Sequence, residues 1–174
     1  MRQTFTASQW IPRPVEEVFA FFADPKNLIL LMPEWNKARI EHAKLVPAPE
    51  DLSHDRAFAA GAGSFITISF RPFPLAPFRW QWRAVISEFA WNEHFCDEQL
   101  RGPFAHWKHC HRLQAESRNN VLGTVITDVV VYEMKMGRLG ELAHSLFASR
   151  QIKALFAYRH AQVERILGGK ADRP

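Results

Sequence analysis

The sequence has few cysteines and no long apolar segment. Of its 174 residues, only Cys96 and Cys110 are cysteines. No apolar run approaches the roughly 18 residues that a membrane-spanning helix needs, and residues 1–12 lack the apolar region of a signal peptide. We therefore expect no membrane span, a cytoplasmic location, and thiols that stay reduced and inert.

Clusters of like charge are also missing. The formal net charge is only +4, and the basic residues are spread from Arg2 to Arg173. Nucleic-acid surfaces carry clustered Lys and Arg, so we expect no nucleic-acid partner. Aromatic residues, by contrast, are plentiful at 13%, with 14 Phe and 6 Trp. Such side chains suit both a core and the wall of a ligand pocket.

The N-terminal part predicts a strand, two short helices and a second strand. Residues 3–11 alternate and contain many β-branched and aromatic side chains, which is typical of a strand. Apolar side chains then recur at helical spacing, at Val15, Val18, Phe19 and Phe22. Asp24 and Pro25 are a cap and a first-turn proline for a helix over 25–31. A less regular strand follows over 37–46.

The remainder predicts five strands and one long helix. The strands cover residues 61–70, 78–86, 94–101, 105–114 and 122–133. In the strand over 78–86, Phe78, Trp80, Trp82, Ala84 and Ile86 form the expected dry face. The helix covers 137–167 and ends at Gly168-Gly169, and we expect the tail 170–174 to be disordered. This order predicts a single α+β domain over 1–169, in which a curved seven-stranded antiparallel sheet surrounds the C-terminal helix.

Several segments resemble a known superfamily. They are PVEEVFAFFADPKNL at 14–28, FCDEQLRGPF at 95–104, WKHCH at 107–111, TDVVVY at 127–132 and FAYR at 156–159. Over about residues 3–167 the chain resembles the START/Bet v 1-like helix-grip proteins, called SRPBCC proteins in bacteria. This superfamily includes the polyketide cyclase/dehydrase and lipid-transport group. The pattern FxDxQxxGPFxxWxHxH is similar to that of an uncharacterised bacterial branch.

The resemblance implies a cavity between sheet and helix that holds lipids, sterols, polyketides or aromatic compounds. It does not imply one shared activity, because a fold hosts many functions.

Polar residues concentrate on the strands 94–101 and 105–114. One hairpin register pairs Phe95 with His111, Cys96 with Cys110, Asp97 with His109, and Gln99 with Trp107. A slip of one residue would invert this arrangement. In this register Asp97 and the two histidines share a face, and Asp128 and Tyr132 on the last strand could extend the cluster.

Three interpretations of this cluster stay open. It could be a satisfied polar network inside the sheet, or a pocket floor that orients an apolar ligand. It could also be an acid–base pair of His109 or His111 with Asp97 or Asp128. With Asp97 or His94, the two histidines could also make three metal ligands. The sequence has no HExxH, no CxxC and no second histidine pair, so we expect no metal and no other cofactor.

The first hypothesis is non-enzymatic binding of a small hydrophobic molecule: a lipid, a polyketide or an aromatic compound. The predicted contacts are Phe22, Phe70, Trp82, Phe95, Asp97, Gln99, Trp107, His109, His111, Asp128, Val130, Tyr132, Phe156 and Arg159. The alternative is a cyclase or dehydratase acting on such a ligand. A third interpretation is an interaction domain that docks through the apolar loop 72–78. A homodimer is compatible with the sequence.

Overall fold

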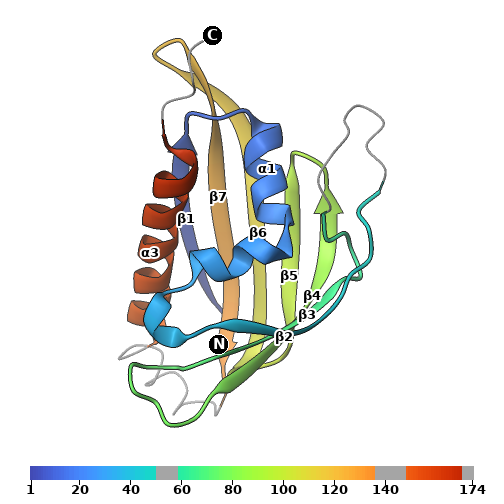
Figure 1. The fold of residues 1–174 in the computed structure, drawn as a ribbon, viewed down its shortest axis with the longest axis vertical. Coiled ribbons are helices and arrows are strands. Elements are labelled where there is room, and N and C mark those ends of the chain that lie inside the picture. Colours follow the sequence, from blue (N-terminus) through green and yellow to red (C-terminus); the bar gives the residue numbers. More distant parts are fainter. Residues whose placement is uncertain (50–58, 136–147, 170–174) are drawn as a thin grey trace.

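Seven strands form one antiparallel sheet in the order β1-β7-β6-β5-β4-β3-β2 (Figure 1). The computed structural model describes residues 1–49, 59–135 and 148–169. The strands are β1 (Gln3–Ile11), β2 (Arg39–Lys44), β3 (Phe65–Phe70), β4 (Trp80–Ala90), β5 (His94–Arg101), β6 (Phe104–Arg118) and β7 (Val121–Met134). The helices are α1 (Val15–Ala23), the short 3-10 helices η1 (Pro25–Leu31) and η2 (Glu34–Asn36), and α3 (Ser149–Leu167).

The predicted order of strands and helices is confirmed. Asp24 begins η1 as expected, because its carboxylate accepts a hydrogen bond from the backbone N–H of Lys26 at 2.9 Å. The helix is of the 3-10 type. The short helix η2 had no signal strong enough to predict it. Of the predicted long helix, the described part is α3, while residues 137–147 and the tail 170–174 lie outside the described residues.

The hairpin register expected for β5 and β6 is confirmed in its central part. Phe95 lies opposite His111, Cys96 opposite Cys110, and Asp97 opposite His109. The regular pairing ends at Glu98 opposite Lys108, one residue before the expected pair of Gln99 and Trp107. The β6–β7 turn places Asn119 and Asn120 at φ values of 51° and 63°. Two left-handed residues are what a tight hairpin turn requires, and Asn tolerates that conformation.

The helices α1 and α3 cover the same face of the sheet (Figure 1). Helix α1 contacts β6 and β7, and α3 contacts β1 and η1. Two hydrophobic clusters lie between helices and sheet. The first cluster is built around Ile11, Val18, Phe19, Phe95, Leu113, Ile126 and Val163. The second cluster consists of Trp107, Val130, Tyr132, Ile152 and Phe156, with Phe5, Trp82 and Phe104 packed against it.

The predicted dry face of the strand at 78–86 is only partly dry. Phe78 and Trp80 are 47% and 41% exposed, whereas Ile86 is buried. The alternation correctly showed which side chains share a face, but it did not show how far the helices cover that face. The apolar loop before this strand also exposes Phe73 and Leu75. Among the described helices, none is long and apolar enough to cross a membrane.

Candidate functional site

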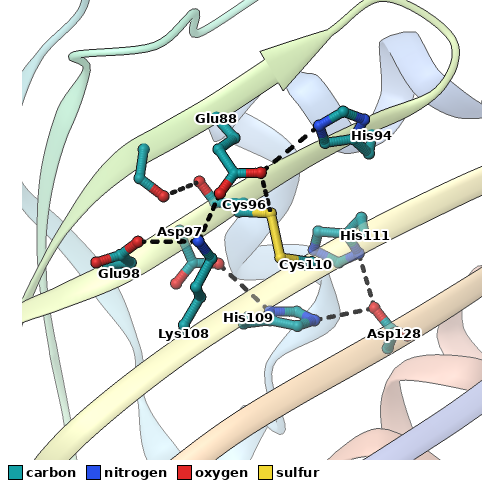
Figure 2. Close-up of a disulfide and its surroundings, with 11 residues drawn as sticks. Glu88, His94, Cys96, Asp97, Glu98, Lys108, His109, Cys110, His111 and Asp128 are labelled. Atoms are coloured by element: carbon teal, nitrogen blue, oxygen red, sulfur yellow. Dashed lines mark hydrogen bonds and ion pairs between the residues drawn. A yellow bond between two sulfur atoms is a disulfide. The ribbon is translucent and has the colours of Figure 1, made fainter.

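A buried polar cluster lies on the helix-facing side of β5, β6 and β7. Asp97 comes from β5, His109 and His111 from β6, and Asp128 from β7 (Figure 2). The alternation of each strand directs these side chains to one side. His109, His111 and Asp128 are each only 3% exposed. The side chain of Asp97 is 22% exposed, so it is the member of this group that reaches solvent.

Asp128 is the centre of the cluster. Its Oδ1 lies 3.0 Å from Nε2 of His109 and 2.7 Å from Nδ1 of His111. Its Oδ2 lies 3.6 Å from Nε2 of His160 on α3. On the other side of the ring, Nδ1 of His109 lies 3.3 Å from Oδ1 of Asp97. One carboxylate thus contacts three histidines, and one histidine lies between two carboxylates.

The hydrogen bonding of this cluster is incomplete. The His109–Asp128 contact has the geometry of a hydrogen bond. His111 Nδ1 is close to Asp128, but the angles of that contact are poor, and within the described residues neither it nor the buried Nε2 of His160 has a hydrogen-bond partner. Buried polar atoms are usually paired, so these two nitrogens call for an explanation.

Burial and neighbouring charges shift the pKa values of the cluster in different directions. Burial would raise the pKa of Asp128, but the interactions with His111, His109 and His160 hold that pKa well below its usual value. Burial also favours neutral His109, yet its contacts with Asp128 and Asp97 raise its pKa. For His111, burial and the proximity of His109 lower the pKa to about 4. Near pH 7, therefore, Asp128 is a carboxylate and His111 is a neutral imidazole.

Aromatic rings surround the polar cluster. The ring of His111 lies 5.1 Å from that of Phe22 and 4.6 Å from that of Phe95, centroid to centroid. The ring of His109 lies 5.3 Å from that of Phe156 on α3. These partners belong to both hydrophobic clusters, so the polar groups lie where the two clusters meet. The resulting arrangement is a small polar patch inside an apolar interior.

The structure brings most of the predicted contact residues to this region. Trp82 and Trp107 pack edge to face with centroids 5.0 Å apart, and Val130 and Tyr132 are buried in the same cluster. Arg159 lies over the ring of Phe156 at 5.3 Å. Its charge contributes to the lowered pKa of His111.

Two predicted contact residues have other surroundings. Phe70 packs against the exposed Trp80, at 6.4 Å between centroids. Gln99 braces the β5–β6 turn: its Nε2 donates to the carbonyl of Phe104 at 2.8 Å, and its Oε1 accepts from the N–H of Phe104 at 3.3 Å. Both amide atoms of Gln99 are therefore engaged within the turn and not in the polar cluster.

Sequence reasoning missed His160 and Gln9. His160 stands four residues after the buried Phe156, and side chains at that spacing share a helix face. This spacing is the signal in the sequence that could have identified it. Gln9 on β1 donates from Nε2 to the carbonyl of His160 at 2.9 Å. It thereby ties the edge strand to the helix at the level of the cluster.

A disulfide lies on the opposite side of the same two strands. Cys96 and Cys110 are bonded to each other, and their Cα atoms are 4.1 Å apart (Figure 2). Glu88 on β4 lies beside it and forms ion pairs with Lys108 and with His94. The expectation of two reduced thiols is therefore wrong. The physical reason is the register, because two cysteines directly opposite each other on paired strands are close enough to bond.

Comparison with known proteins identifies the fold. No family model and no curated protein matches this sequence. Among solved structures, a Chromobacterium violaceum protein is 16% identical, with a TM-score of 0.67, covering 96% of this chain and 99% of its own. The ginseng major latex-like protein 151 from Panax ginseng is 10% identical, with a TM-score of 0.62, covering 95% of this chain and 97% of its own. Ara h 8.0201 is 14% identical, with a TM-score of 0.58, covering 95% of this chain and 99% of its own.

The protein therefore has a Bet v 1-like fold, an α+β helix-grip architecture. At these levels of identity the likeness establishes the fold alone. What the protein does has to be argued from its own site.

Proposed function

We propose that this protein binds a small, largely apolar molecule of the lipid, polyketide or aromatic class between the sheet and α3. The observation that carries the proposal is a pair of buried nitrogens, His111 Nδ1 and His160 Nε2, which lie near Asp128 but form no hydrogen bond within the described residues. Ligand sites of this kind are mostly apolar, with a few convergent polar groups that orient the ligand. A polar atom of the ligand would give these nitrogens the hydrogen bond that they lack.

The chemistry of the cluster favours a ligand with a hydroxyl group. A hydroxyl both donates and accepts, so it can serve a neutral imidazole in either tautomer and can also donate to a carboxylate. The rest of the ligand would contact the rings of Phe22, Phe95, Trp107 and Phe156, each of which already lies against one of the two histidines.

The test begins with native mass spectrometry of the purified chain and extraction of any bound compound. Affinity for the fluorescent probe 1-anilinonaphthalene-8-sulfonate is then measured for the wild type and for Trp107→Ala. Trp107 is 8% exposed and contacts Trp82, Phe104 and Tyr132, so its removal should weaken probe binding roughly tenfold or more.

The matched control is Trp80→Ala, because Trp80 is the same residue type but is 41% exposed. It should bind the probe like the wild type. Unchanged binding in folded Trp107→Ala would remove the proposal, as would an equal loss in Trp80→Ala. If Trp107→Ala does not fold, Trp107→Phe, which keeps a ring, replaces it.

A cyclase or dehydratase is the second candidate, and the state of His111 is what favours it. His109 has a carboxylate at each ring nitrogen, so it has no free edge for a substrate. His111 is neutral near pH 7 and contacts Asp128 through one nitrogen only. A hydroxylated ligand that loses water on incubation with the wild type, but not with His111→Ala, would show catalysis. An unchanged ligand mass would leave binding as the function.

A further inference from the structure

We infer that Asp97, His109 and His111 form a binding site for one divalent transition-metal ion such as Zn²⁺. This goes beyond the binding of an apolar molecule and does not depend on it. It also reverses the expectation drawn from the sequence, where no metal motif was found. Three separate observations support it: the spacing of the donor atoms, the position of Asp128 behind the histidines, and the charge balance of the buried cluster.

The donor atoms of the three residues already lie close together. One ligand atom from each of Asp97, His109 and His111 falls within 4.8 Å of the others. The distance between Nδ1 of His109 and Oδ1 of Asp97 is 3.3 Å. For a tetrahedral Zn²⁺ with bonds of about 2.0–2.1 Å, two ligand atoms are about 3.3–3.4 Å apart. This pair therefore needs little movement to hold an ion, and His111 offers a third donor atom within 4.8 Å of both.

Asp128 lies behind both histidines, where metal sites usually have a carboxylate. Its Oδ1 is hydrogen-bonded to Nε2 of His109, which leaves Nδ1 of that ring facing Asp97. The same oxygen lies 2.7 Å from Nδ1 of His111, although this contact is not a hydrogen bond, and Nε2 on the far edge of that ring is the nitrogen that would face an ion. A carboxylate that accepts from the second nitrogen of a ligating histidine sets its tautomer and orientation.

The charge of the cluster also suits a divalent cation. Asp97 and Asp128 place a set of two carboxylates against the imidazole rings of His109 and His111. Charges buried in a protein have to be compensated. An ion of charge +2 would balance the set, while the 22% exposure of Asp97 leaves a way in from solvent. Two imidazole nitrogens with one carboxylate oxygen suit Zn²⁺ and neighbouring transition metals better than Mg²⁺ or Ca²⁺, which prefer oxygen ligands.

The sequence also offered His94 as a ligand, but its position in the structure excludes it from this site. It lies on the opposite side of the sheet, with its Nε2 3.7 Å from Glu88 (Figure 2). It is therefore a matched control for the two histidines of the site.

The experiment uses the full chain stripped of metal with EDTA. Zn²⁺ is titrated by calorimetry against a competing chelator, and Co²⁺ is added separately to read its visible absorption. We expect one tight Zn²⁺ per chain and the intense absorption of low-coordinate Co²⁺. Asp97→Asn and His111→Ala should each weaken Zn²⁺ binding roughly 100-fold or more. His94→Ala should bind Zn²⁺ like the wild type.

The inference is overturned if the wild type binds no stoichiometric Zn²⁺, if Asp97→Asn keeps wild-type affinity, or if His94→Ala loses as much as His111→Ala. Asp97→Asn is close in shape and only partly buried, so it decides the matter if His111→Ala does not fold. Probe binding separates the two proposals. A protein that binds the naphthalene probe but no Zn²⁺ refutes only the metal site, and the converse refutes only the apolar site.

Discussion

Asp128 shows how much one buried side chain can organise. It contacts histidines from β6 and from α3, and it is almost completely buried itself. A buried carboxylate without partners would be very unfavourable, so its three neighbours are what make its position tolerable. Its alternation with Ile126 and Val130 on β7 directs it toward the helices. The same alternation is why Asp128 could be predicted from the sequence as an extension of the cluster.

Gly102 leads to a prediction about the β5–β6 turn. A Cβ atom added there would lie 2.2 Å from Oε1 of Gln99, so Gly102→Ala must displace the amide that braces the turn. We expect Gly102→Ala to lower the free energy of unfolding by about 1–2 kcal/mol, through the loss of the two Gln99–Phe104 hydrogen bonds. In a Gln99→Ala background the same substitution should cost much less, which urea denaturation of the four variants would measure.

Additive effects in this cycle would mean that Gln99 and Gly102 do not act on each other. In that case the cost of Gly102→Ala would not come from the Gln99–Phe104 hydrogen bonds.

At the scale of single elements, the disulfide links β5 and β6 at the point where those strands carry the cluster. The bonded residues are 14 positions apart in sequence. For a closed loop of about 15 residues, the entropy lost by the unfolded chain corresponds to about 3 kcal/mol of stability. Dithiothreitol should therefore lower the free energy of unfolding of the wild type by up to this amount, as seen in urea denaturation. The double variant Cys96→Ala/Cys110→Ala should be insensitive to the reductant.

A thiol assay supplies an independent check of the disulfide. Two reactive thiols in the unreduced, denatured wild type would contradict the bond, and so would denaturation curves that do not respond to dithiothreitol.

At the scale of the whole molecule, the packing of α3 against the sheet covers the polar cluster on β5, β6 and β7. Phe156 is 1% exposed, and its ring lies 4.9 Å from that of Phe5 on β1 and 5.3 Å from that of His109. Phe156→Ala should therefore cost about 3–5 kcal/mol of stability, because it opens a cavity between helix and sheet. Chemical denaturation would measure this loss.

Lys153 on the same helix is exposed, so Lys153→Ala is the control and should stay within about 0.5 kcal/mol of the wild type. If Phe156→Ala were as stable as this control, α3 would not be held by the contacts that the structure shows.

Much of this architecture could be predicted because its signals are local. The two-residue period of β1, the apolar spacing of α1 and the cap at Asp24 each depend on neighbours along the chain. The register of the β5–β6 hairpin was also within reach, because a short connection leaves few ways to pair two adjacent strands. From that register it followed that Asp97 and His109 face each other.

The folded chain alone decided the rest. Periodicity shows which side chains share a face, but not which other element covers that face. The exposure of Trp80 and the contact between His160 and Asp128 could therefore not be predicted from the sequence. The occupied amide of Gln99 depends on the shape of one turn. The predicted pairing placed Cys96 opposite Cys110, but the lack of a signal peptide and of a membrane span led to the expectation of reduced thiols. The structure instead bonds the two cysteines, whose Cα atoms are 4.1 Å apart. Each of these features depends on the distance between atoms that the chain brings together only when it folds.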